Sequence, residues 1–220
     1  MFAAVTAQFL AHADAERAAG MSAYMRHQFA FLGIPTPLRR RLSRPLLAAA
    51  KTATAVDWDL VQQCWQRAER EFQYLAINYL QTVKDRLTPA DLPVLESLVI
   101  SKAWWDTVDG LDRVIGRVAL RYPQANQTLL EYSLSDNIWL RRVAIDHQLD
   151  RREQTDTCLL EQIIVNNLGL SEFFINKAIG WSLREYAKTN PSWVLDFLKR
   201  HRQRLSALSF REASKHLTLT

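Results

Sequence analysis

The segment from Trp104 to Asp109 reads Trp-Trp-Asp-Thr-Val-Asp and combines two tryptophans with two carboxylates. Aromatic faces attract cations, and a carboxylate aimed at growing positive charge lowers a reaction barrier. The chain as a whole carries a net charge of +5, so this local acidity is not a general property of the sequence. A core helix rarely needs such a combination. The segment therefore indicates a site that binds a cation and stabilises a developing positive charge.

The elements that must position this site are helices. Apolar residues recur at helical spacing along almost the whole chain, and strand-like alternation is scarce. Six glycines and seven prolines are few for an all-β fold, which needs a turn about every 8–12 residues. We expect an all-α protein with about a dozen helices of roughly 10–18 residues, joined by short connections.

The helices repeat along the sequence. An Ala-Ile pair begins at Ala76, Ala144 and Ala178, at separations of 68 and 34 residues, and the missing member of the series falls at Gly110. A helical period of 34 residues is typical of stacked helix pairs of the HEAT or TPR kind. We therefore expect an α-solenoid of HEAT-like repeats, forming a single domain over residues 1–220, in which equivalent helices line one concave wall.

The register of the repeats places the chemical residues on one face. Asp109 directly precedes the small residue of its repeat, Trp105 lies one turn earlier, and Trp181 lies one turn later in its own repeat. Residues four apart share a helix face. The concave wall then carries polar and aromatic groups; the alternative is that the tryptophans pack between repeats and the polar groups are solvated. The same stripe includes Trp139, His147 and Lys177, with Arg142 beside it.

Basic residues gather in two further runs, Arg39–Arg41 with Arg44 and Lys199–Arg204. Together with the positive net charge they point to a polyanion, either nucleic acid or an anionic membrane surface. Phosphate contacts from such groups position a duplex without reading its sequence. Two basic runs beside a polar wall favour a DNA groove, and the alternative is the solvated surface of a mildly basic protein.

Cysteine usage and hydropathy bear on location. Cys64 and Cys158 each lie in an apolar helical pattern, outside any CxxC pair, and no histidine cluster offers metal-ligand spacing. We expect two buried thiols in a reducing compartment, with no metal and no cofactor. The first residues lack a signal-peptide pattern, and no stretch approaches the roughly 18 apolar residues of a membrane span. These features predict a soluble, cytoplasmic protein.

A series of ordered segments resembles the AlkD-type DNA alkylation repair glycosylases, a family built of HEAT-like repeats. The segments run from about residue 20 to the C-terminus, and no single helical-repeat pattern would generate so many of them in order. Residues 1–20 match poorly and are expected to form a variable first helix. The matching segments are residues 24–27, 31–37, 70–73, 102–109, 136–142, 173–191 and 211–216.

This resemblance implies excision of positively charged N3- and N7-alkylated purines from double-stranded DNA, without flipping the base into a pocket. It implies a site of two tryptophans, one aspartate and one arginine, which match Trp105, Trp181, Asp109 and Arg142. Asp109 would stabilise the oxocarbenium ion and position a water, the tryptophans would contact deoxyribose and lesion, and Arg142 would hold a phosphate.

With no lysine assigned as nucleophile, we expect a monofunctional hydrolase that leaves an abasic site, although Lys177 on the same stripe leaves lyase activity open. We expect a monomer that binds alkylated duplex DNA. Two alternatives are a non-catalytic DNA-structure binder on the same fold and a protein-binding scaffold. The side chains expected to contact DNA are Tyr24, near the backbone, with Arg39, Arg40, Arg141, Lys177, Arg184 and Lys215.

Overall fold

The structure is a computed structural model that describes residues 1–217, and these residues form helices without any strand. A single isolated bridge pairs Ala30 with Glu69. The all-α prediction is confirmed. Several helices span only seven to nine residues and are shorter than expected.

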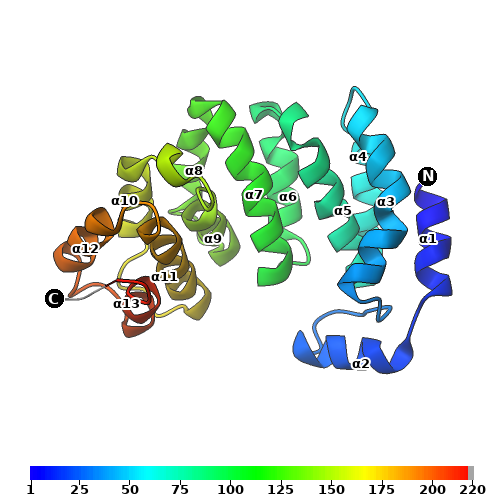
Figure 1. The fold of residues 1–220 in the computed structure, drawn as a ribbon, viewed down its shortest axis with the longest axis horizontal. Coiled ribbons are helices and arrows are strands. Elements are labelled where there is room, and N and C mark those ends of the chain that lie inside the picture. Colours follow the sequence, from blue (N-terminus) through cyan, green and yellow to red (C-terminus); the bar gives the residue numbers. More distant parts are fainter. Residues whose placement is uncertain (218–220) are drawn as a thin grey trace. The chain divides into compact units, whose positions relative to one another are not determined.

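The chain divides into two compact units, residues 1–87 and the part that begins at Thr88, so the single domain over residues 1–220 stays a prediction. The first unit (blue to cyan in Figure 1) contains α1 (Phe2–Ala11), α2 (Ala15–Tyr24), α3 (Thr36–Thr52), α4 (Trp58–Gln66), α5 (Arg70–Val83) and η1 (Lys84–Arg86).

The second unit holds the residues around which the candidate site is built. It runs from green to red in Figure 1 and contains η2 (Pro89–Asp91), α6 (Leu92–Ile100), α7 (Trp105–Arg121), η3 (Pro123–Ala125), α8 (Asn126–Tyr132), α9 (Ile138–Asp146), η4 (Arg152–Gln154), α10 (Thr157–Val165), α11 (Phe173–Ala187), α12 (Pro191–Arg200) and α13 (Ala207–Ala213).

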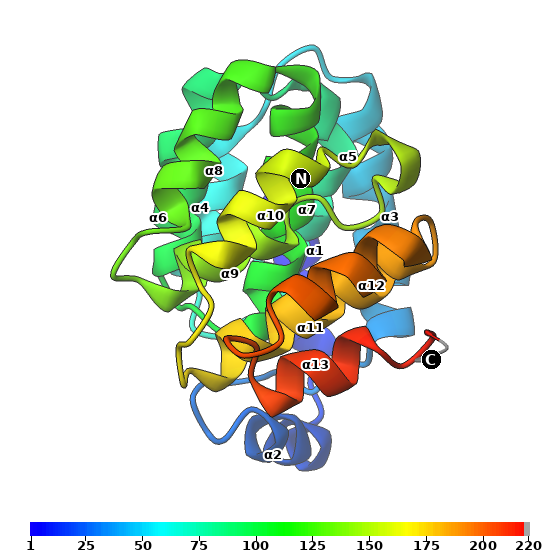
Figure 2. The same ribbon diagram turned by 90° about the vertical axis from the view of Figure 1, so that its left-hand side faces the viewer.

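Helices α7, α9, α11 and α13 pack against one another in chain order, and Figure 2 shows α11 and α13 side by side. The predicted small residues Gly110, Ala144 and Ala178 lie on α7, α9 and α11. Hydrogen bonds join neighbouring repeats at nearly the same spacing, as between Ser209 Oγ and the Asn176 carbonyl, 33 residues apart. The helical repeat is therefore present within this unit.

Gly116 allows α7 to approach the chain that leaves α9. A Cβ atom at this position would lie 2.0 Å from the carbonyl oxygen of His147, which is backbone and cannot rotate away. Arg151 also donates to the Gly116 carbonyl at 2.7 Å. The absence of a side chain at Gly116 is thus a condition for close packing of the two repeats.

We expect Gly116→Ala to lower the free energy of unfolding by about 1–3 kcal/mol, because the added methyl group forces the backbone of two repeats apart. Gly20 on α2 is the matched control, since a Cβ there meets nothing within 4 Å. Gly20→Ala should raise stability by about 0.5–1 kcal/mol through helix propensity. Urea unfolding of both variants measures the two values, and equal effects would contradict the packing argument.

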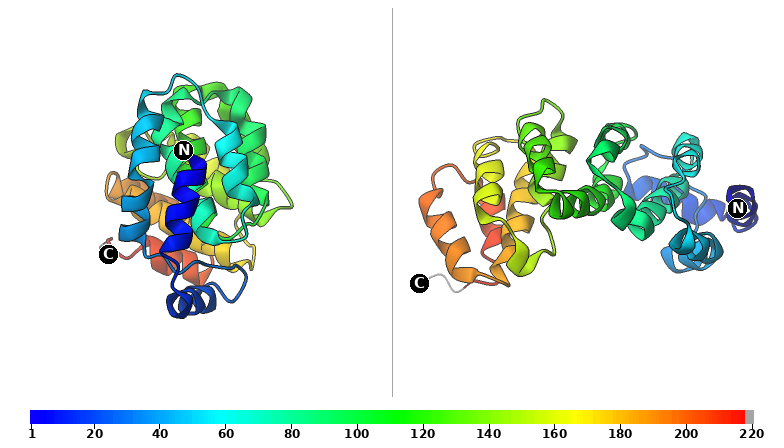
Figure 3. Two further views of the ribbon diagram at one scale, coloured as in Figure 1. Left: turned by 90° about the vertical axis from the view of Figure 1, so that its right-hand side faces the viewer. Right: turned by 90° about the horizontal axis from the view of Figure 1, so that it is seen from above.

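In the first unit, α1 packs on α3 (Figure 3), and Phe9 contacts Phe72 of α5 at 5.3 Å between ring centroids. Residues 1–20 were expected to form one variable first helix. The structure instead has two helices in this range, α1 and the first part of α2. The break occurs because the Asp14 side chain accepts a hydrogen bond from the Arg17 amide and caps a new helix.

Buried Glu71 holds the turn that follows α2. Its carboxylate accepts hydrogen bonds from the backbone amides of Leu32, Gly33 and Ile34 at 2.9–3.1 Å. Gly33 has a φ of +86°, a conformation that glycine adopts without strain. These contacts fix the segment that leads into α3.

The two cysteines differ. Cys64 is buried, and burial raises the pKa of its thiol to about 12. Cys158 is exposed, so the prediction of two buried thiols is wrong for this residue. The apolar stripe of α10 is supplied by Leu159, Leu160 and Ile163, which turns Cys158 outward. In the described part of the chain, every helix is too short or too polar to cross a membrane.

Candidate functional site

Three helices of the second unit begin beside one another, and an aromatic cluster joins their first turns. Trp104 precedes α7, Trp139 lies in the first turn of α9, and Phe174 lies in the first turn of α11. Their ring centroids are 5.0–5.6 Å apart. Trp104 and Trp139 therefore pack between repeats, which confirms that alternative for Trp139. Phe174 was not predicted as part of this cluster, although its spacing of 35 residues from Trp139 repeats the spacing from Trp104 to Trp139.

Local capping fixes where two of these helices start. The side chain of Asn137 accepts a hydrogen bond from the Trp139 amide, and that of Glu172 accepts one from the Phe174 amide. Such caps satisfy backbone donors that a helix start leaves open. Arg142 accordingly lies in the second turn of α9, and Asp109 holds the corresponding place in the second turn of α7.

Asp109 and Arg142 form a bidentate ion pair. Arg142 donates from Nε to Asp109 Oδ1 at 2.7 Å and from Nη2 to Oδ2 at 2.8 Å. A third hydrogen bond runs from Nη1 to the Phe174 carbonyl at 2.9 Å. The Arg142 side chain is 4% exposed, whereas that of Asp109 is 19% exposed. The structure thus brings two predicted site residues together, with the arginine inside and the carboxylate partly accessible.

The position of Arg142 bears on its expected role. Each guanidinium nitrogen already donates to a protein oxygen. The pKa of Arg142 is raised by the carboxylates of Asp146 and Asp109, which outweigh burial. Because its side chain is 4% exposed, Arg142 would have to move before it could contact a phosphate. In the geometry observed, it orients Asp109.

Trp105 and Trp181 lie on the helices before and after α9 in the row of packed helices. Trp105 lies one turn before Asp109 on α7, and Trp181 lies on α11, further from the helix start than Phe174. Helix α9, which carries Arg142, packs against both α7 and α11. Both tryptophans are half-buried, so part of each ring faces solvent. Their role as site residues stays a prediction.

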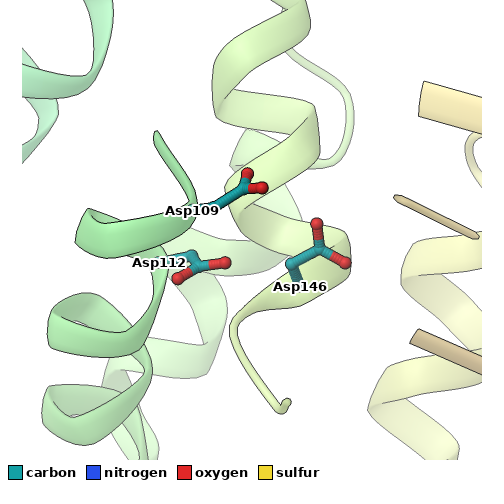
Figure 4. A group of neighbouring side chains, drawn as sticks. All are labelled: Asp109, Asp112 and Asp146. Carbon is teal, nitrogen blue, oxygen red and sulfur yellow. The ribbon is translucent and has the colours of Figure 1, made fainter. Parts of the chain in front are cut away.

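Two further carboxylates lie behind Asp109, and the sequence analysis did not single them out. Asp112 of α7 and Asp146 of α9 are each 1% exposed. Ligand-type oxygen atoms of Asp109, Asp112 and Asp146 lie within 4.8 Å of one another (Figure 4). These are the only clustered metal-type donors among the described residues. Arg142 already supplies a positive charge here and binds both oxygens of Asp109, so we assign no metal to the group.

His147 was expected on the polar wall, and this expectation is wrong. The residue is 2% exposed, and its Nδ1 lies 2.6 Å from the Ala144 carbonyl. Burial, with a smaller effect of Arg151, lowers the pKa of His147 to about 3. The imidazole is neutral and belongs to the packing between repeats, because the close approach of α7 at Gly116 covers it.

A second charged group forms on α11 and α13 around Glu212. Its buried carboxylate pairs with Lys177 at 3.0 Å, Arg184 at 2.8 Å and Lys215 at 2.9 Å. Hydrogen bonds from Lys215 and Lys177 lower the pKa of Glu212 to about 2. Three cations predicted to contact DNA are therefore gathered by one carboxylate. Glu212 was missed, although it stands 34 residues after Ala178 in the repeat register.

We expect Glu212→Gln to lower the free energy of unfolding at pH 7 by about 1.5–3 kcal/mol, because three cations lose a charged acceptor. The folded-state pKa of Glu212 is lowered, so its contribution is present above pH 4.5 and is lost as pH falls towards 2. The difference in the free energy of unfolding between wild type and Glu212→Gln should therefore shrink as pH falls from 4.5 and vanish near pH 2. Glu153→Gln, an exposed control on η4, should stay within about 0.5 kcal/mol. A difference that persists unchanged to pH 2 would mean that the ionised Glu212 carboxylate does not supply this stability.

Arg141, the neighbour of Arg142, has a different environment. It donates to the carbonyl oxygens of Ser135 and Leu134 and to Asn167 Oδ1. The side chain thereby ties the turn before α9 to the turn after α10. Its expected contact with DNA stays a prediction, and the bonds observed are structural.

The remaining predicted DNA contacts lie in the first unit. Tyr24, the last residue of α2, is 74% exposed, and Arg40 on α3 is also exposed. Arg39 is only 8% exposed, with its guanidinium 4.4 Å from the centre of the Tyr74 ring. Arg39 is therefore held against α5 by a cation–π contact, while Arg40 and Tyr24 are the accessible members of this set.

Comparison with known proteins identifies the family. The sequence profile of the family described as "DNA alkylation repair enzyme" matches residues 5–217, and the chain belongs to this family. A solved structure described as "Predicted DNA alkylation repair enzyme from Enterococcus faecalis" is 40% identical, with a TM-score of 0.84. The match covers 93% of this chain and 96% of that one. No curated protein matches the chain.

Proposed function

We propose that this protein is a DNA glycosylase that excises positively charged N3- and N7-alkylated purines from double-stranded DNA by hydrolysis of the N-glycosidic bond. The observation that carries the proposal is a partly exposed carboxylate, Asp109, held in one orientation by the buried guanidinium of Arg142. Membership of the DNA alkylation repair family supplies the substrate class.

An alkylated purine of this kind already carries a positive charge and is a good leaving group. As the bond from C1′ to nitrogen breaks, both electrons move to the purine, which becomes neutral, and the sugar becomes an oxocarbenium ion. Asp109 would stabilise that ion and align a water for attack at C1′. No general acid is required, unlike in most glycoside hydrolysis, where one carboxylic acid protonates the leaving group.

Arg142 supports this role by restricting the carboxylate. A bidentate guanidinium–carboxylate pair fixes both oxygens in one plane, so Asp109 needs little reorganisation when the charge develops. The unused lone pairs of its oxygens remain for a water and the sugar. We propose orientation of Asp109 as the main function of Arg142, in place of the phosphate contact that the resemblance implies.

Trp105 and Trp181 would receive the deoxyribose and the cationic base. Each cation–π or CH–π contact of this type contributes roughly 0.5–2 kcal/mol. Trp105 lies one turn before Asp109 on α7, Trp181 lies on α11, and both residues are half-buried. Such partly exposed residues suit a lesion that stays in the duplex, without a deep pocket for a flipped base.

The cations gathered by Glu212 would contact DNA phosphates and position the duplex. The Lys177 ammonium lies 3.0 Å from the Glu212 carboxylate, and an ammonium in an ion pair is a poor nucleophile. We therefore propose a monofunctional enzyme. We also propose that it requires no cofactor and acts as a cytoplasmic monomer. Base release should leave an abasic site in an intact strand. Borohydride trapping of a covalent enzyme–DNA adduct would contradict this.

Salt dependence separates the DNA-binding interpretations from a protein-binding scaffold. We expect duplex affinity to fall steeply between low and moderate salt, with a log–log slope of roughly −0.9 for each phosphate contact. Electrophoretic or fluorescence titrations at several salt concentrations measure that slope. Salt-sensitive binding without any base release would instead favour a non-catalytic DNA-structure binder, and binding independent of salt would favour a scaffold.

A further inference from the structure

We propose that Asp112 and Asp146 form a buried acid pair that retains a proton at neutral pH and so keeps Arg142 committed to Asp109. Asp146 is then a positioning residue for the site. The consequence for catalysis rests on the proposed function, whereas the retained proton can be tested without it.

The geometry of the pair follows from helical spacing. Asp112 lies one turn after Asp109 on α7, and Asp146 lies one turn after Arg142 on α9. Figure 4 shows the three side chains near one another, with Asp109 and Asp112 on one helix and Asp146 on the other. Asp112 and Asp146 are each 1% exposed, so bulk water does not solvate their carboxyl groups.

Among the described residues, no hydrogen-bond donor contacts either oxygen of Asp112 or of Asp146. The cation paired with Asp146 is Arg142, whose Nη2 lies 3.7 Å from Asp146 Oδ2, beyond hydrogen-bonding distance. That guanidinium already donates to both oxygens of Asp109. One buried positive charge therefore faces three carboxylates.

Two additional unpaired negative charges at this depth would be strongly unfavourable, because burial of an unpaired ion is among the most costly events in folding. Binding a proton removes the charge of one of the two groups. Two neighbouring carboxyl groups behave in this way, with one member protonated well above its usual range.

The directions of the pKa shifts agree with this arrangement. Burial, with a smaller contribution from Asp109, raises the pKa of Asp146 to about 8 against the opposing effects of Arg142 and Arg113. Burial also raises the pKa of Asp112 well above its ordinary value, with added repulsion from Asp146 and Asp109. Because the two groups interact, the proton belongs to the pair.

The other charged groups near the pair have partners elsewhere. On α7, Arg113 pairs with exposed Asp150. Helices α6, α8, α10 and α11 also pack against α9. Their titratable groups interact as follows: Glu96 with Tyr132, Glu131 with Gln127, Glu161 with Arg200, Lys177 and Arg184 with Glu212, Glu185 with Lys188, and Tyr186 with Trp193, while Cys158 is exposed.

Loss of the proton would leave both members of the pair ionised, and the added anion would compete with Asp109 for Arg142. The carboxylate at the site would then lose part of its orientation. We therefore expect base release to decline as pH rises above about 8. The variant Asp146→Asn, which cannot ionise but keeps the shape of the protonated acid, should shift this alkaline decline upward by at least one pH unit.

The pH dependence of stability tests the proton directly. A folded-state pKa raised from 3.8 to about 8 means that wild type loses stability as pH rises through this range. The Tm of Asp146→Asn minus that of wild type should therefore increase from pH 5 to pH 9. The matched control is Asp136→Asn, which changes an exposed aspartate of the same unit and should give a constant difference.

Infrared spectroscopy of the wild-type protein gives a readout that does not depend on any variant folding. At pH 7 we expect the carbonyl stretch of a protonated carboxylic acid, and this band should disappear on titration above pH 9. The band should also be lost or shifted in Asp146→Asn and in Asp112→Asn, and kept in Asp136→Asn.

The outcomes separate the two proposals. A protonated-acid band without any base release would support the acid pair and overturn the glycosylase. Base release without the band, together with the same pH dependence in Asp146→Asn and Asp136→Asn, would overturn the acid pair alone.

Discussion

Asp109→Asn is expected to lower the single-turnover rate of base release by at least about 100-fold, the range seen when a group that stabilises a transition-state charge is removed. Asparagine keeps the size of the side chain but removes the negative charge that faces the oxocarbenium ion. The Arg142 guanidinium also loses its ionic partner, so the orientation of the new side chain is less defined. Both effects act on the transition state.

Duplex affinity should be retained in this variant, because the proposed phosphate contacts come from other residues. Titration of the same duplex with wild type and variant measures this separately from the rate. Asp106→Asn is the control, since it removes a carboxylate from the same segment of α7. A full rate in Asp109→Asn, or an equal loss in both variants, would mean that Asp109 does not stabilise the developing charge.

Arg142→Ala is expected to destabilise the protein by about 3–5 kcal/mol, the effect of removing one partner from a buried ion pair. The change leaves Asp109 without its bidentate donor, removes the one cation beside Asp146, and opens a space next to Phe174. Urea unfolding monitored by helical circular dichroism measures the loss.

Arg121→Ala on the exposed end of α7 is the control and should change stability by less than about 0.5 kcal/mol. Arg142→Lys separates charge from geometry, because lysine keeps the positive charge but cannot bind a carboxylate with two parallel donors. We expect this variant to fold and to lose activity. A fully active Arg142→Lys would contradict the orienting role.

Much of the fold could be predicted from the sequence. The spacing of Ala76, Gly110, Ala144 and Ala178 gives the helical repeat, because a small residue must recur wherever equivalent helices approach closely. The same register put Asp109 near the accessible side of α7, and the structure leaves its carboxylate partly exposed.

The sequence could not show how side chains divide between packing and exposure. Trp104 and Trp105 are adjacent and identical in type, and spacing alone did not show that Trp104, just before the first turn of α7, packs against Trp139 and Phe174. His147 shared the register of the wall but is covered where Gly116 lets α7 approach. Such differences depend on local distances between helices, which spacing alone does not encode.

The buried acids were missed for a related reason. Asp112 and Asp146 look like ordinary polar positions on amphipathic helices, and only the contact between α7 and α9 brings them behind Asp109. Arg142 was predicted as a site residue, but its bond to Asp109 was not. It lies off the centre of the predicted stripe and reaches Asp109 from the next repeat. Interactions between repeats, rather than within one helix, build this site.

The most direct test of the central claim is to incubate the wild-type protein with a methylated DNA duplex and to quantify free 7-methylguanine, with Asp109→Asn assayed in parallel. We predict release of the base by wild type, an abasic site in an unbroken strand, and almost no release by the variant. No release by wild type, with salt-sensitive duplex binding intact, would contradict the glycosylase and leave a DNA-binding protein without this activity.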